Sequence, residues 1–174
     1  KNPAIGVDLH TVKTLWEKPG GGSSTPVPSG EYLVAHAKDE KAGIVCYRWT
    51  DKGIEEFWKY PKVTRRSDSS PIVEGNYVFL FGADMRLCLD LKTGKVLHKE
   101  ASKHDISSPI FADGKIFAYE IKGSFLNMVK ADPNDFTELG KTKVQALRCS
   151  SPAIAGNKLL VRMADRIACY DLGQ

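Results

Sequence analysis

The sequence predicts an all-β fold built from a repeated unit of four antiparallel strands. The first indication is a Ser/Thr-Pro step that recurs at Thr25-Pro26, Ser70-Pro71, Ser108-Pro109 and Ser151-Pro152. Successive steps are 45, 38 and 43 residues apart, and a fixed period of roughly 20–50 residues indicates a repeat architecture. The second indication is that an apolar stretch, a Gly-containing turn and a second apolar run follow each step. Because these runs are rich in β-branched and aromatic residues, they are predicted to be strands.

The unit after Ser70-Pro71 shows the other two strands most clearly. Residues 87–90 lead through Lys92-Thr93-Gly94 into residues 95–99, and the Gly supplies the positive φ of a tight turn. Helical periodicity is weak and confined to residues 51–58 and 133–139. A four-stranded meander cannot bury both of its faces alone, so repeated meanders pack against one another. We therefore predict a β-propeller made of four-stranded antiparallel blades.

The repeat divides the chain into three whole blades flanked by two partial ones. The predicted units are residues 20–64, 65–103 and 104–146, with partial units at 1–19 and 147–174. Two closures remain open: a ring of about four blades within one chain, or part of a ring of about seven or eight blades completed by a second copy or by further chain. The second is favoured, because the sequence starts in the middle of a blade.

A motif around an Asp-containing turn recurs in the same phase. Residues 88–98 read Cys-Leu-Asp-Leu-Lys-Thr-Gly-Lys-Val-Leu-His, residues 6–16 contain the corresponding Asp, Thr and Trp, and the motif begins again at residues 169–172. This pattern resembles the tryptophan-docking repeat of quinoprotein-like (PQQ-type repeat) propellers, Ala-x-Asp-x-x-Thr-Gly-x-x-x-Trp, in which the Trp of each blade packs against its neighbour. The structural residues that the resemblance implies are Asp8, Trp16, Trp58, Asp90, Thr93, Gly94 and Asp171.

The resemblance implies two kinds of function. The repeat also resembles that of bacterial outer-membrane assembly lipoprotein propellers, which implies a non-catalytic, protein-binding scaffold without cofactor or metal in an extracytoplasmic (periplasmic or secreted) setting. The alternative is a fragment of a quinone-dependent dehydrogenase, which implies pyrroloquinoline quinone, a Ca²⁺ site and oxidation of an alcohol or sugar. That type of enzyme uses an adjacent Cys pair against the quinone, and this sequence has none. The scaffold is therefore favoured.

Charge and hydropathy argue against two other classes of protein. The 174 residues carry a formal net charge of +4 without a long Lys/Arg tract, which argues against nucleic-acid binding. No stretch reaches the roughly 18 consecutive apolar residues of a membrane-spanning helix. We expect neither a nucleic-acid partner nor a membrane span.

The cysteines are predicted to be structural. The sequence has four Cys but no Cys-x-x-Cys pair, and no His cluster accompanies them, so a metal site is not indicated. Cys46, Cys88 and Cys169 occupy the same position of the third strand in different blades. Unpaired Cys is among the most buried residue types, so we expect these three to be buried. Cys149 lies in a loop and is the one candidate for a reactive thiol.

The candidate binding residues lie in loops on one face. In a meander, the loops between strands two and three and those between successive blades emerge on the same face, and every Arg except Arg48 falls in or beside these loops. Arg presents a planar charged fork suited to carboxylate or phosphate. The face is predicted to bind an anionic ligand or an acidic protein partner through Arg65, Arg66, Asp68, Arg86, His104, Asp105, Arg148 and Arg166. The alternative is that these arginines are solvated or pair with Asp side chains of the same loops.

Overall fold

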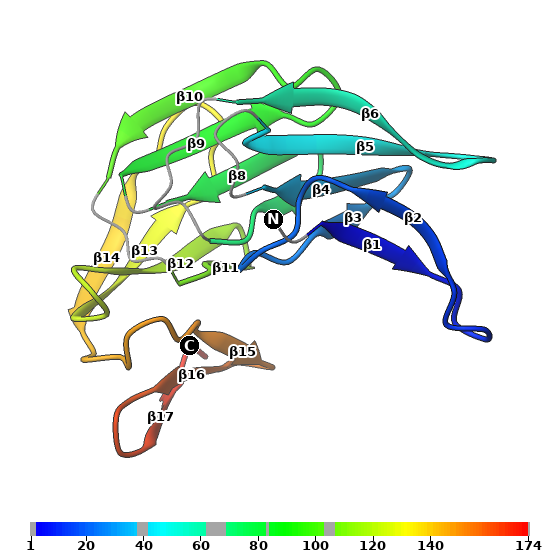
Figure 1. The fold of residues 1–174 in the computed structure, drawn as a ribbon. Helices are drawn as coiled ribbons and strands as arrows, with labels where there is room; N and C mark the ends of the chain where they lie inside the picture. The colour runs from blue at the N-terminus through cyan, green and yellow to red at the C-terminus, as the bar shows by residue number, and fades with distance from the viewer. Residues whose placement is uncertain (1–2, 38–41, 62–68, 83, 103–106, 174) are drawn as a thin grey trace.

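The computed structural model describes residues 3–37, 42–61, 69–82, 84–102 and 107–173. These residues form five antiparallel sheets, and none of them lies in a helix. The predicted all-β fold of four-stranded blades is confirmed (Figure 1). The two segments with weak helical periodicity are extended instead, since residues 53–58 belong to a strand and residues 133–137 to the connection before another.

The strands follow one another in space as they do in sequence. The first sheet contains β1 (Ala4–Val7) and β2 (Thr14–Lys18), and the second contains β3 (Val27–Ser29), β4 (Tyr32–His36), β5 (Ile44–Thr50) and β6 (Gly53–Tyr60). The third contains β7 (Ile72–Glu74), β8 (Tyr77–Phe81), β9 (Met85–Asp90) and β10 (Val96–Ala101). The fourth contains β11 (Ile110–Ala112), β12 (Lys115–Glu120), β13 (Phe125–Lys130) and β14 (Glu138–Lys143). The fifth contains β15 (Ala153–Ala155), β16 (Lys158–Arg162) and β17 (Ile167–Asp171). Each sheet lies within one of the predicted units, whose boundaries stay a prediction.

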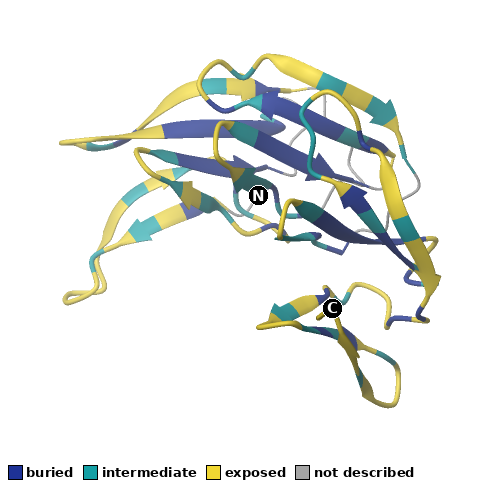
Figure 2. Ribbon diagram, turned by 180° about the vertical axis from the view of Figure 1, so that it is seen from behind, coloured by how far each residue is buried: buried dark blue, intermediate teal, exposed yellow. Residues whose placement is uncertain are grey.

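The hydrophobic core lies between successive sheets rather than within any one of them. The second and third strands of each whole blade are mostly buried, whereas the fourth strand is largely exposed (Figure 2). Val34 and Cys46 of one blade, for example, share a buried cluster with Leu80 and Leu87 of the next. Burying each such Leu or Val stabilises the fold by about 1.5–3 kcal/mol, so the blades depend on their neighbours.

The hydroxyl groups of the Ser/Thr-Pro steps link the blades beside their first strands. The backbone N–H of Thr25 donates to the hydroxyl of Ser70 (2.8 Å), that of Ser70 to Ser108 (3.0 Å), and that of Ser108 to Ser151 (3.1 Å). We call this series the hydroxyl ladder. The spacing that reveals the repeat in the sequence is therefore the spacing of residues that join neighbouring blades.

A β-bulge interrupts the pairing of the third strand with the fourth in four sheets. The register shifts beside the pairs Gly6–Trp16, Cys46–Trp58, Cys88–His98 and Met128–Gly140. An extra residue on one strand bends that strand and re-aims its side chains. The fourth-strand member of each pair is called the docking position below.

Candidate functional site

The Asp of the repeat organises the turn between the third and fourth strands. Oδ1 of Asp90 accepts hydrogen bonds from the backbone N–H (2.8 Å) and the hydroxyl (2.7 Å) of Thr93. Oδ1 of Asp8 accepts the same two from Thr11, at 2.7 and 2.9 Å. The hydrogen bonds to Asp8, led by the backbone N–H of Thr11, lower the pKa of its carboxyl group because they favour the charged form.

Trp58 lies at the docking position of β6, between neighbouring blades. A β-carbon added to Gly94, in the turn of the next blade, would lie only 2.7 Å from Cδ2 of the Trp58 indole. The indole N–H donates a 2.7 Å hydrogen bond to the carbonyl of Leu91. Gly94 also has a φ of 69°, so its left-handed backbone and the close approach of the ring both favour glycine.

Trp16 and His98 hold the docking positions of two other blades. The Trp16 ring lies beside Gly53 of the next blade and meets Trp49 edge to face, with ring centroids 6.0 Å apart. The His98 ring meets Phe136 of the next blade edge to face at 5.0 Å. Three fourth strands thus each present one ring to the following blade.

Asp171, at the end of β17, accepts hydrogen bonds at one carboxylate oxygen and forms an ion pair at the other. Its Oδ1 accepts hydrogen bonds from the backbone N–H of Gly173 (2.9 Å) and the side-chain amide of Asn157 (3.1 Å). Lys158 forms an ion pair with Oδ2. The Lys158 ammonium, followed by the Gly173 N–H, lowers the pKa of Asp171.

The structure describes three of the eight candidate binding residues. Outside the described residues lie Arg65, Arg66, Asp68, His104 and Asp105. Arg148 and Arg166 are exposed, and the backbone N–H of Leu147 donates to the carbonyl of Arg162 at 2.7 Å. This hydrogen bond holds the β14–β15 connection beside the β16–β17 turn. We call the exposed side chains of Arg148, Arg162 and Arg166 the arginine surface.

Arg86 is part of the contact between two blades. Its guanidinium bridges Glu100 of its own blade at 3.0 Å and Glu120 of the next at 3.1 Å, and its side chain is only 11% exposed. Lys141 forms a further ion pair with Glu120. Since Arg86 and Glu120 are 34 residues apart in the sequence, no local pattern indicated this network. Arg86 therefore binds within the fold rather than on the arginine surface.

The four thiols differ in burial. Cys46 and Cys88 are buried, as predicted, but Cys169 is exposed, so that prediction is wrong. The two buried thiols face a docking ring, Trp58 or His98, whereas β17 is the outermost strand of its described sheet. Burial raises the pKa of both Cys46 and Cys88 to about 12.

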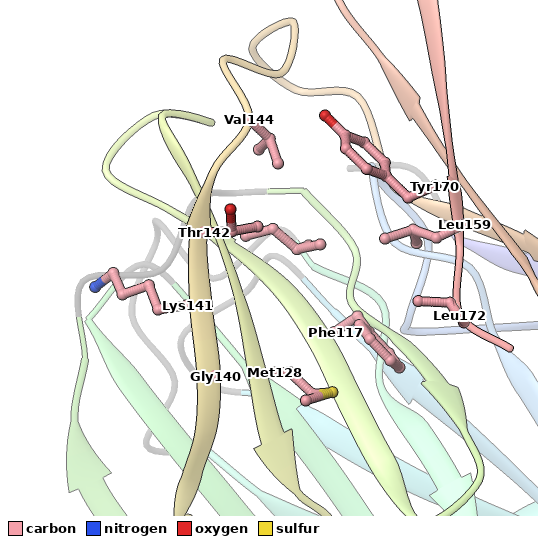
Figure 3. Close-up of a pocket in the computed structure, with 10 residues that line it drawn as sticks. Phe117, Met128, Gly140, Lys141, Thr142, Val144, Leu159, Tyr170 and Leu172 are labelled. Carbon is pink, nitrogen blue, oxygen red and sulfur yellow. The ribbon is translucent and has the colours of Figure 1, made fainter. Parts of the chain in front are cut away.

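An apolar pocket of about 270 Å³ lies between β14 and the sheet of β15–β17. Most of its wall is formed by Phe117, Leu126, Met128, Leu159, Tyr170 and Leu172. Figure 3 shows Phe117 and Met128 of one sheet opposite Leu159, Tyr170 and Leu172 at the next, with Gly140 beside them. Sequence reasoning missed the pocket because the third blade retains the strand of the repeat but not its turn motif.

The part of the chain that the structure describes lacks two features. No three His, Cys, Asp or Glu side chains there are grouped so as to hold a metal ion. Nor does any described segment form a helix long and apolar enough to cross a membrane.

Comparison with known proteins relates the chain to solved structures alone. No protein-family model matches the sequence, and no curated protein matches it. BamB from Moraxella catarrhalis is similar with a TM-score of 0.66 and 15% identity, covering 97% of this chain and 51% of BamB. The computationally designed Ika4 protein is similar with a TM-score of 0.60 and 11% identity, covering 90% of this chain and 96% of Ika4. A europium-containing methanol dehydrogenase is similar with a TM-score of 0.53 and 15% identity, covering 70% and 24%.

These similarities define the fold class. The chain has the fold of a quinoprotein-like β-propeller, which confirms the predicted resemblance at the level of the fold. It spans about half the length of BamB.

Proposed function

We propose that the chain is a non-catalytic PQQ-like repeat β-propeller that serves as a scaffold for an anionic ligand or an acidic protein partner. The observation that carries this proposal is the arginine surface, where a backbone hydrogen bond holds two Arg-bearing segments together. As the repeat resemblance implies, the proposed setting is extracytoplasmic.

The charges of the arginine surface are accessible to a partner. Arg148 and Arg162 are exposed and form no ion pair with any other described residue. Arg166 pairs only with the adjacent Asp165 at 3.1 Å, and these side chains are 62% and 72% exposed. An exposed pair of this kind contributes about 0–1 kcal/mol, so an anionic partner can displace it.

The backbone beneath the arginine surface is ordered before a partner arrives. The Leu147 N–H bond fixes one segment to the other, and Met163 N–H bonds to the Arg166 carbonyl at 2.8 Å within the turn. A preorganised surface loses less conformational entropy on binding than a mobile loop does. The arrangement therefore suits recognition of a partner without chemical conversion of it.

Titration of the whole chain with poly-L-glutamate, followed by calorimetry at two salt concentrations, tests this function. We expect the double variant Arg148→Ser/Arg162→Ser to bind about tenfold more weakly, with a smaller salt dependence. The matched control is Arg48→Ser, because Arg48 forms an ion pair with Glu31 of its own blade at 2.6 Å and lies outside the arginine surface. Equal losses in the two variants, or no binding by the unmodified chain, would contradict the proposal.

We also propose that a second copy completes the propeller ring. Large apolar side chains are exposed on both end blades, with Ile5 and Val7 on β1 and Ile167 on β17. The end repeats of soluble repeat proteins normally present polar outer faces. The apolar faces of this chain are suited to burial against further blades.

A further inference from the structure

The docking position is equivalent in four blades by strand pairing, but one of the four lacks a side chain. In each blade it faces a third-strand residue beside the β-bulge. Trp16, Trp58 and His98 occupy three of these positions, and Gly140 occupies the fourth. The sheet of β11–β14 therefore presents no aromatic ring to the following sheet from its docking position.

The pocket of about 270 Å³ lies where that ring would be. Met128, which faces Gly140, takes up part of the space, and its Cε would lie 3.6 Å from a β-carbon at Gly140. An apolar cavity of about 150 Å³ in another protein is large enough to bind benzene. The pocket beside Gly140, called the Gly140 pocket below, is larger than that cavity and therefore has room for a bicyclic ring.

The backbone acceptor that receives the Trp58 indole has a counterpart at this pocket. Leu91 follows Asp90, and its N–H bonds to the Asn76 carbonyl at 2.8 Å. Leu172 follows Asp171, and its N–H bonds to the Asn157 carbonyl at 2.7 Å. The two leucines thus hold the same place in their blades, and Leu172 lines the pocket. Its carbonyl corresponds to the one that accepts the indole N–H of Trp58.

We propose that the Gly140 pocket binds the tryptophan side chain of a protein partner. This inference rests on the proposed scaffold function and names a contact through which the scaffold holds its partner. The apolar wall suits the face of an indole, and the Leu172 carbonyl suits its N–H. A polypeptide is favoured over a free small molecule because, in this same fold, a strand delivers the indole to the equivalent place.

Two probes test the source of the ring: free indole, and a five-residue peptide, acetyl-Gly-Ser-Trp-Ser-Gly-amide, with its Trp→Ala form as control. Binding to the whole chain is followed by saturation-transfer NMR and by the thermal unfolding midpoint. We expect the Trp peptide to bind, the Ala peptide not to bind, and indole to compete with the Trp peptide. If indole binds but the Trp peptide does not, the proposal that a protein partner supplies the ring is overturned.

Filling the pocket from within provides the matched variants. Gly140→Trp should raise the unfolding midpoint and weaken binding of the Trp peptide at least about tenfold, because the new indole occupies the site. Gly140→Ala, which adds one methyl group at an ordinary contact distance, and Lys143→Trp, on the same strand but outside the pocket wall, should retain binding. Unchanged binding of the Trp peptide by Gly140→Trp overturns the proposal. The proposal is also overturned if Gly140→Trp has a raised unfolding midpoint but no peptide binds the unmodified chain.

Binding of poly-L-glutamate should be the same in Gly140→Trp as in the unmodified chain. Failure of this inference is therefore distinguishable from failure of the scaffold function.

Discussion

Val12 has the left-handed backbone conformation that Gly94 has in the equivalent turn of another blade. Its N–H bonds to the Asp8 carbonyl at 2.8 Å with a φ of 56°, as the N–H of Gly94 bonds to the Asp90 carbonyl at 2.8 Å with a φ of 69°. The left-handed region costs an L-residue about 1–2 kcal/mol, and a β-branched residue is least suited to it. The Val12 side chain is 75% exposed, so little packing offsets this strain.

Val12→Gly should therefore stabilise the protein. The relief of strain exceeds the added entropy of the unfolded chain, which leaves a net gain of about 0.5–1 kcal/mol. The midpoint of urea unfolding measures this gain. Lys13→Gly, one residue further on, is the control and should lower the midpoint, whereas a lower midpoint for Val12→Gly would contradict the strain.

The thiols should fall into two classes of reactivity. The pKa of about 12 for Cys46 and Cys88 leaves almost no thiolate at pH 8, and burial blocks access. Cys149 and Cys169 are exposed and should react with a disulfide reagent within minutes, while the other two react only after unfolding. A double Cys149→Ser/Cys169→Ser variant should show no fast phase. A persistent fast phase would mean that the buried pair is accessible.

At the scale of the strands, Arg86 of β9 ties its blade to the next through Glu120 of β12. Arg86→Met should lower the free energy of unfolding by about 2–4 kcal/mol, because Glu120, a carboxylate that is only 9% exposed, would lose one cationic partner and keep Lys141. Chemical denaturation measures the loss. Arg166→Met, which removes an exposed pair, should change stability by less than about 1 kcal/mol. Adding Glu120→Leu to Arg86→Met should recover part of the loss, and a further large loss would argue against the pairing.

The sequence predicted the strands and turns of the repeat better than it predicted the positions at which individual blades depart from the repeat. The Ser/Thr-Pro steps and the Gly turns indicated the strands because their backbone requirements are local. Two deviations were missed: the exposure of Cys169 and the absence of a ring at the docking position of Gly140. Each depends on what the adjacent blade or strand contributes. The Arg86 network was missed for the same reason, as its partners come from different blades. Arg65, Arg66, Asp68, His104 and Asp105 remain predictions.

For the whole molecule, completion of the ring predicts self-association. Sedimentation at about 100 μM should give twice the 19.2 kDa mass of one chain. Ile5→Lys and Ile167→Lys place charge on the exposed apolar end faces and should each shift the chain towards monomer. Glu31→Lys, in the turn between β3 and β4, should not. A monomer for the unmodified chain at this concentration would exclude the two-copy ring.

The hydroxyl ladder gives such a ring a chemical polarity. At each step the earlier blade supplies the N–H and the later blade supplies the hydroxyl oxygen. The ladder therefore begins with the Thr25 hydroxyl as an acceptor and ends with the Ser151 N–H as a donor. Copies can extend this N–H-to-hydroxyl series only head to tail, since a back-to-back arrangement would place two N–H donors, or two hydroxyls, at the joint. Two head-to-tail joints related by one twofold axis would continue the series through both copies, so the ladder favours a closed ring of two copies over a back-to-back pair.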